Sequence, residues 1–209
     1  MTKEEVLKNY RVGEILEATR RVIGHFGYEG CTVDRVAEEA RIAKGTIYLY
    51  FPNKDEMLHS AVVEGLRALT KELRSSDDAA APPLERLCRL IKEMFRIQRA
   101  HEDFVKALIL DSRFVSYEPG DRREEELRKL YLEMLDHLSS VLEGAMKQGA
   151  ARAIDPHLAA FMLSEMTAAA LKRRLLGMNS ESVADEEQTV LELFLYGVRG
   201  MRPAKSNGQ

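Results

Sequence analysis

The chain has 209 residues, of which 45% are hydrophobic and 31% charged, and it contains no tryptophan and only six prolines. This composition is typical of a helix-rich globular protein and excludes a fibrous or disordered chain. No uncharged apolar segment reaches the roughly 18 residues of a membrane span, and residues 1–8 lack the apolar stretch of a secretory signal. We therefore expect a cytoplasmic protein with no membrane partner.

Charge and cysteine content give little indication of a partner. The net charge is −3, and residues 1–60 carry nine Lys/Arg against ten Asp/Glu, whereas nucleic-acid-binding domains are usually basic. Cys31 and Cys88 form no CxxC pair, so neither a disulfide framework nor a zinc site is indicated. We expect no cofactor and no metal.

Local patterns near the start of the chain predict three helices. Apolar residues recur at helical spacing over residues 10–26, and Gly27 is a natural stop. Thr32 suits the N-cap of a second helix, only about two turns long. After a break at residues 41–43, a third short helix is expected over residues 44–51.

The rest of the chain predicts further helices. Pro52 ends the third one, since proline disfavours helical geometry in the residue before it, and Asn53 with Glu56 caps a fourth that runs to about Arg74. After a Ser-, Asp-, Ala- and Pro-rich connection at residues 75–83, apolar stripes and caps predict helices over about 84–95, 105–109, 121–149, 155–177 and 184–200.

These elements, about nine helices in all, predict an all-α fold. Three short helices ending at Phe51 have the proportions of a helix-turn-helix, with small Ala37 where two helices cross and apolar Ile42 and Ile47 facing the core. We expect a DNA-binding domain in residues 1–54, with the helix-turn-helix at about 33–52. A larger helical domain follows at 55–202, and a tail at 203–209.

The segments TVDRVA (residues 32–37) and IAKGTIYLYFPNK (residues 42–54) closely resemble the signature of TetR-type repressors. The resemblance is strong over about residues 9–60, and beyond them it extends only to helix number and order. It implies a transcriptional repressor that binds a palindromic operator as a homodimer. It also implies that a small-molecule effector, bound in the C-terminal domain, favours a spacing of the two recognition helices that no longer fits the DNA.

The resemblance further implies which residues touch DNA. Tyr48 and Lys54 correspond to phosphate contacts, which fix register without reading sequence. Gly45 lets DNA approach the start of the recognition helix, where backbone N–H groups favour a phosphate. Leu49 is an expected base contact, through a thymine methyl. The full expected set is Thr32, Arg35, Lys44, Gly45, Thr46, Tyr48, Leu49, Tyr50 and Lys54.

Some positions depart from the family pattern or allow two interpretations. Arg41 stands where the family usually has a glycine in the turn, and a side chain there raises the cost of a left-handed backbone by about 1 kcal/mol. Ala43 replaces the usual serine cap, and Leu49 replaces a residue that is often polar. For Tyr48, Tyr50 and Phe51 the alternative to a DNA contact is plain core packing, and Phe51 is expected to face inward.

The C-terminal helices suggest a partner chain. In the family, the last two helices pair with those of a second copy in a four-helix bundle. Residues 158–176 carry apolar and small residues, and residues 190–198 are apolar nearly all round, more than one core-facing stripe requires. A homodimer through these helices is therefore expected, and the alternative is a last helix that is central in the monomer.

The identity of the effector is the part of the function that the sequence determines least. An apolar or amphipathic molecule is expected, and inward-facing candidates to line its pocket are Phe95, Tyr131, Met134, Met162 and Met166, although such stripes are also ordinary core. Lys172, Arg173 and Arg174 suit either an anionic ligand or a solvated helix end.

Other residues allow both a reactive role and a simpler one. His101, Glu102 and Asp103 are adjacent, but neighbours on a helix point in different directions, which disfavours a metal site. Cys31, just before a helix N-terminus, is either a redox sensor with a lowered pKa or an inert thiol. There is no P-loop, GxSxG or HExxH motif, so an enzyme is not expected. A helical interaction module with a vestigial DNA domain remains the alternative to a regulator.

Overall fold

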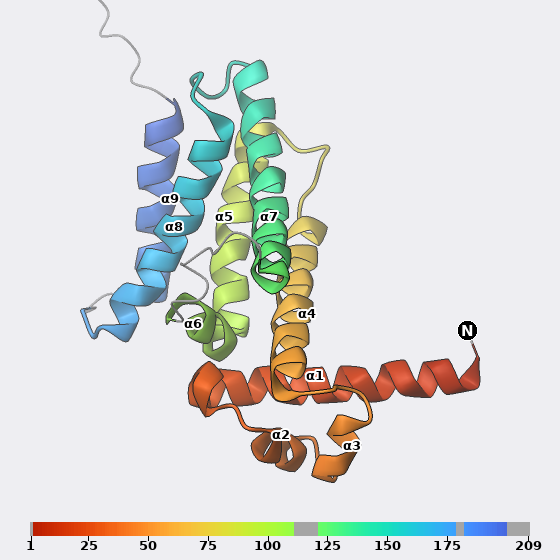
Figure 1. Ribbon diagram of the computed structural model, residues 1–209. Coiled ribbons are helices and arrows are strands. Elements are labelled where there is room, and N and C mark those ends of the chain that lie inside the picture. Colours follow the sequence, from red (N-terminus) through yellow and green to blue (C-terminus); the bar gives the residue numbers. More distant parts are fainter. Residues whose placement is uncertain (1, 111–120, 179–181, 200–209) are drawn as a thin grey trace, which may run out of the picture. The chain divides into compact units, whose positions relative to one another are not determined.

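The computed structural model describes residues 2–110, 121–178 and 182–199 (Figure 1). Every regular element within these residues is a helix, which confirms the predicted all-α fold of about nine helices. The elements are α1 (Lys3–Gly30), α2 (Val33–Glu39), α3 (Lys44–Tyr48), α4 (Lys54–Ser75), α5 (Pro83–Ala100), α6 (Glu102–Leu110), α7 (Arg122–Lys147), α8 (Pro156–Leu175) and α9 (Val183–Arg199).

The chain forms two compact units, each described here by itself. Unit 1 comprises the described residues of Met1–Glu72 and Ile97–Leu132, and unit 2 those of Leu73–Arg96 and Glu133–Gln209. Unit 1 thus contains α6 as well as the predicted helix-turn-helix. The boundary predicted after residue 54 follows the end of a motif rather than packing, and it remains a prediction. The predicted tail, 203–209, lies outside the described residues.

Helix α1 begins seven residues earlier than residue 10, where the apolar stripe predicts it. The Glu5 N–H donates to the Thr2 hydroxyl at 3.2 Å, and the Thr2 N–H donates to the Glu5 carboxylate at 2.7 Å, which is a capping box. The first turns are exposed, so they leave no apolar stripe in the sequence. Gly27, at φ 71° and ψ 173°, breaks the helical geometry where a stop is predicted, and Gly30 ends the helix.

The turn between α2 and α3 has a defined hydrogen-bond pattern. The Ile42 N–H donates to the Ala37 carbonyl at 2.9 Å, and the Arg41 N–H donates to the Glu38 carbonyl at 3.1 Å. This pair of bonds is a Schellman motif, and it places Arg41 at φ 55°. Ala43 then precedes α3 and supplies no side-chain cap. Both departures from the family pattern therefore have the structural effect expected of them.

Helix α3 is shorter than the predicted segment of residues 44–51. It ends at Tyr48, and the chain continues in a turn in which the Phe51 N–H still donates to the Ile47 carbonyl at 2.9 Å. Asn53 caps α4 as predicted, since its side-chain oxygen accepts a hydrogen bond from the Glu56 N–H at 2.8 Å.

One hydrophobic core holds unit 1 together, with buried side chains from α1, α2, α3, α4 and α6. Helix α6 lies very close to its neighbours. A Cβ at Gly24 of α1 would lie 2.8 Å from Asp103 Cβ, and one at Gly65 of α4 would lie 2.5 Å from the Phe104 ring. These two glycines let α6 pack directly against α1 and α4.

Unit 2 contains α8 and α9, which lie side by side (Figure 1). Asp155 caps α8, and its carboxylate accepts from the N–H groups of His157 and Leu158, with Pro156 in the first turn, as predicted. None of the described helices is long and apolar enough to cross a membrane.

Candidate nucleic-acid interface

The predicted recognition helix presents most of its residues to solvent. Lys44 and Gly45 are exposed and Thr46 is half-buried, whereas Ile47 is buried in the core of unit 1. Apart from the adjacent residues and the nearby backbone of α3, no atom of the described residues lies within 4 Å of the position that a Cβ would occupy at Gly45. The missing side chain at Gly45 is therefore not required by packing within the chain, and it leaves room for a molecule that approaches from outside.

Lys44 makes an ion pair with Asp34 of α2 across the turn. Its Nζ lies 2.9 Å from the Asp34 carboxylate, and this hydrogen bond raises the pKa of Lys44. The pair is exposed, so its contribution to stability is small. Lys44 therefore remains charged and can exchange Asp34 for a phosphate oxygen.

The large side chains at and just after the end of α3 fall into an exposed group and a buried group. Leu49 is 79% exposed and Tyr48 is 47% exposed, as expected for residues that face DNA. Tyr50 is half-buried against the core of unit 1, and Phe51 is only 7% exposed. The packing interpretation therefore holds for Phe51, and Tyr50 has at most an edge available to a partner.

Thr32 and Arg35 carry structural contacts in addition to their predicted role. The Thr32 hydroxyl accepts a hydrogen bond from the Arg35 N–H at 3.3 Å and so caps α2. The Arg35 guanidinium lies 4.1 Å from the centre of the Phe26 ring and donates to the Gly30 carbonyl. Both side chains are exposed, whereas Lys54, at the start of α4, is half-buried.

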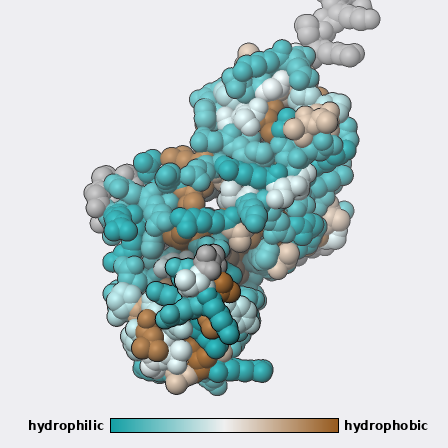
Figure 2. Space-filling view, turned by 90° about the vertical axis from the view of Figure 1, so that its right-hand side faces the viewer, coloured by the Kyte–Doolittle hydropathy of each residue, from teal (hydrophilic) through white to brown (hydrophobic). Residues whose placement is uncertain are grey.

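The structure thus brings the predicted contacts onto α2, α3 and the start of α4. Figure 2 shows hydrophobic residues exposed among hydrophilic ones in its lower part, at the level of α1 to α3 in Figure 1. A surface that mixes basic, hydroxyl and apolar side chains can bind both phosphates and base edges. That these residues contact DNA remains a prediction.

The five effector candidates are divided between the two units. Phe95 is fully buried, and Met134 and Met166 are half-buried, all in unit 2. Tyr131 belongs to unit 1. The expectation that Met162 faces inward is wrong for the single chain, because Met162 is 52% exposed on α8.

Met162 instead belongs to an exposed apolar face on the last two helices. The other large apolar side chains of this face are also exposed, although α8 and α9 are packed against each other elsewhere. We define the apolar α8–α9 face by Leu158, Phe161, Met162, Leu193 and Tyr196.

The residues considered for an anionic ligand, a metal or a redox role have structural explanations. Arg174 lies 3.3 Å from the buried carboxylate of Glu186. The imidazole of His101 lies 3.2 Å from Glu72, and no group of metal ligands occurs among the described residues. Cys31 is fully buried, and burial raises its pKa to about 11, so the thiol is protonated at neutral pH and the inert interpretation is favoured.

A pocket of 480 Å³ in unit 1, lined by α1, α4 and residues 99–104, was not predicted from the sequence. Two of its three arginines, Arg20 and Arg21, lie on α1 and look like ordinary surface charges in a helical pattern. Only the packing of α6 against α1 brings them opposite residues 99–104.

Comparison with known proteins agrees with this architecture. Residues 15–61 match the family described as bacterial regulatory proteins of the tetR family, and residues 80–171 match the tetracyclin repressor-like C-terminal domain. The first match contains α2, the turn and α3.

Relatives and solved structures extend the similarity over nearly the whole chain. An uncharacterised HTH-type transcriptional regulator of Bacillus subtilis is 28% identical over 193 residues, covering 90% of this chain and 94% of its own length. A fatty acid metabolism regulator protein of the same organism is 26% identical over 187 residues, covering 88% and 94%. The transcriptional regulator FadR from Bacillus subtilis, solved in complex with stearoyl-CoA, superimposes with a TM-score of 0.74 at 22% identity, covering 88% and 98%.

Both family matches agree with the signature in residues 32–54 and with the all-helical architecture of the described residues, and the relatives matched over most of the chain are transcriptional regulators. The chain belongs to the TetR family of transcriptional regulators.

Proposed function

We propose that this regulator is a repressor that binds a palindromic operator as a homodimer and leaves it when an acyl-coenzyme A binds in the C-terminal helical domain. The observation that carries the proposal is the exposed surface of α2 and α3, where Leu49 projects into solvent beside Lys44 and Tyr48.

The proposed DNA contacts divide into two kinds. Lys44, Tyr48 and Lys54 hold phosphates, which supplies affinity and makes binding sensitive to salt. Leu49 contacts a thymine methyl in the major groove and therefore supplies sequence preference. Because the phosphate contacts are few per protomer, tight binding requires two protomers on one operator.

The apolar α8–α9 face supports the homodimer. Five exposed apolar side chains on two neighbouring helices form a surface that monomers rarely leave in water. A two-fold axis through this face would produce a four-helix bundle and two symmetric recognition helices, and hence a palindromic target.

The class of effector is suggested by the relatives. One is a fatty acid metabolism regulator, and a protein of the same fold was solved with stearoyl-CoA. An acyl-CoA is amphipathic, so its chain suits a site lined by residues such as Phe95, Met134 and Met166. Release then requires that the acyl-CoA bind the DNA-free conformation more tightly than the DNA-bound one.

Fluorescence anisotropy tests the proposal. Labelled duplexes tiled across the DNA that flanks the gene are titrated with the full chain at two salt concentrations. We expect tight, salt-sensitive binding to a duplex with a palindrome. Addition of palmitoyl- or stearoyl-CoA to that complex should lower the anisotropy, whereas the free fatty acid and acetyl-CoA serve as controls.

Uniformly weak binding to these duplexes and to genomic fragments would favour the helical interaction module instead. Tight binding without release by any acyl-CoA would keep the repressor and reject the effector class. Release by the free fatty acid as readily as by its CoA ester would move the recognised group from the ester to the chain alone.

A further inference from the structure

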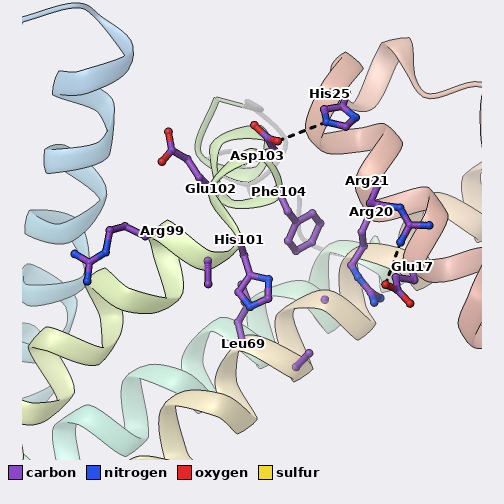
Figure 3. A pocket seen from close by; sticks show the side chains of 13 residues that line it. Glu17, Arg20, Arg21, His25, Leu69, Arg99, His101, Glu102, Asp103 and Phe104 are labelled. Carbon is purple, nitrogen blue, oxygen red and sulfur yellow. Dashed lines mark hydrogen bonds and ion pairs between the residues drawn. The ribbon is translucent and has the colours of Figure 1, made fainter. Parts of the chain in front are cut away.

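The pocket in unit 1 lies beside the helix that supports the helix-turn-helix. Figure 3 shows its lining side chains, which come from α1, from α4 and from residues 99–104, where α5 gives way to α6. Its volume of 480 Å³ is in the range of sites that bind small molecules. Three of its side chains are arginines and two are histidines, namely Arg20, Arg21, Arg99, His25 and His101.

Several of the polar groups that line this pocket are already paired with one another or with neighbouring residues. Arg21 lies 3.0 Å from Glu17 and 2.5 Å from Glu39. His25 lies 3.6 Å from Asp103, the contact drawn between α1 and α6 in Figure 3. Glu17 and Asp103 therefore have cationic neighbours of their own, and within the described residues neither of them forms an ion pair with Arg20.

Arg20 differs from its neighbours. Its Nη1 atom is buried and has no hydrogen-bond partner among the described residues. Its Cδ lies 2.9 Å from the position that a Cβ would occupy at Gly65, so the side chain crosses from α1 to α4. Glu17 and Glu64 act on it only through space, and burial lowers its pKa. A buried guanidinium donor without an acceptor is unfavourable, and an anion in the pocket would relieve this.

We propose that this pocket binds a phosphate-bearing small molecule whose phosphate oxygens accept hydrogen bonds from Arg20. The planar guanidinium presents its N–H groups as a fork that matches the oxygens of a phosphate. Arg21 adds positive charge around the group, and the imidazoles of His25 and His101 line the same pocket and offer further hydrogen-bonding nitrogens. Gly65 provides the space on α4 for the Arg20 side chain.

The phosphate has two possible sources: free phosphate, or the phosphates of a larger molecule such as coenzyme A. Isothermal titration calorimetry of the full chain with inorganic phosphate and with coenzyme A distinguishes them. Similar affinity for both assigns the site to free phosphate, and affinity for coenzyme A at least tenfold higher assigns it to the larger molecule. Neither probe carries an acyl chain, so this inference does not rest on the proposed effector and can stand if that effector fails.

The variant R20Q tests the assignment to Arg20, with R11Q as its matched control, since Arg11 lies on the same helix and is paired with Glu14. We expect R20Q to bind the probe at least tenfold more weakly, R20K to be intermediate because a lysine lacks the fork, and R11Q to bind like the unsubstituted chain.

Equal binding by R20Q and R11Q, or no binding of either probe to the unsubstituted chain at millimolar concentration, would overturn the proposal. If R20Q does not fold, the amide NMR shifts of Gly65 and Ala68 decide. They should move when phosphate or coenzyme A is added to the unsubstituted chain, and shifts that stay fixed with both probes would reject the site.

Discussion

Arg41 adopts the left-handed backbone conformation, which residues other than glycine avoid. At φ 55° it is the sole non-glycine residue with positive φ in the part of the chain that the structure describes. Its position is set by the two hydrogen bonds that end α2, and those bonds also aim α3. The turn thus keeps its geometry although it lacks the glycine that would adopt it without strain.

Replacement of Arg41 by glycine is expected to raise the free energy of unfolding by about 1 kcal/mol, because glycine has no Cβ to crowd the backbone in the left-handed conformation. Urea denaturation at fixed protein concentration measures the change. R41A is the control, since it also removes the arginine side chain but keeps the strain. If R41G and R41A were equally stable, the strain would be negligible.

His137 lies in a buried polar cluster of unit 2. Its Nε2 lies 3.4 Å from Asp77, whose carboxylate accepts hydrogen bonds from Arg86 at 2.8 and 2.6 Å. Burial lowers the pKa of His137, and the bonds from Arg86 lower the pKa of Asp77. The folded chain thus holds His137 neutral and Asp77 ionised, with fewer protons bound than in the unfolded chain.

Unfolding free energy is therefore expected to fall on acidification in two steps. The first starts as the pH drops through about 6.5, where His137 of the unfolded chain gains its proton, and the second starts near 3.8, where Asp77 does so. Chemical denaturation between pH 8 and 5 should show the first step in the unsubstituted chain and a smaller one in H137Q. The control H157Q changes an exposed histidine and should retain the step; its loss there would contradict the assignment.

At the scale of single residues, the sequence predicted what local chemistry determines. The strain at Arg41, the missing cap at Ala43 and the caps at Thr32 and Asn53 follow from side-chain type and spacing. The states of Cys31 and Arg20 depend on which distant residues cover them, and no spacing rule contains that information.

Helix α3 is the element whose surface decides DNA recognition. It consists of five residues and projects Tyr48 and Leu49 from adjacent positions at its end. Because a hydroxyl that contacts a phosphate and an alkyl group that contacts a base act through different physical terms, single substitutions can separate them.

Y48F should weaken binding to every duplex by roughly 1 kcal/mol, since one hydrogen bond is lost regardless of sequence. L49A should lower discrimination at one base pair by roughly 1 to 3 kcal/mol while binding to unrelated DNA stays unchanged. Anisotropy with the operator and with single-base variants measures both effects. The opposite pattern, a uniform loss in L49A or a base-specific loss in Y48F, would exchange the two roles.

Element positions were predicted more reliably than element ends. Apolar stripes and caps predicted every helix of the described residues, but they missed the first turns of α1 and extended α3 too far, to Phe51. The first error arises because the capped start of α1 is polar and exposed. The second arises because Phe51 is buried by a turn that continues the apolar pattern without helical geometry.

At the scale of the whole molecule, the apolar α8–α9 face predicts the assembly. L193E places a charge on this face, and we expect it to convert the dimer to a monomer and to weaken operator binding at least tenfold. Light scattering after size-exclusion chromatography measures the mass. L132E, at a leucine that is 40% exposed on α7, is the control and should remain dimeric. A dimeric L193E would remove this face from the interface.

The division of the chain into packed units was not predictable from periodicity. The motif ends near residue 54, and composition shifts after Ser75, yet unit 1 also includes the described part of Ile97–Leu132. That grouping depends on Gly24 and Gly65, which read as ordinary helix interruptions in the sequence. Their role appears only when α6 is placed against α1 and α4.

The close packing of α6 against α1 and α4 also limits how this regulator can be re-engineered. Hybrid sensors are often designed by grafting a DNA-reading segment onto a foreign sensing domain. A graft cut after residue 54 would remove α6 and most of α4, including Phe104 and Leu108 from the same core as Ile15 and Ile47. The part of this chain that can be transferred as a folded unit is therefore not its first three helices alone. It also includes α4 and α6, so a hybrid would have to keep α6 packed against α1 and α4.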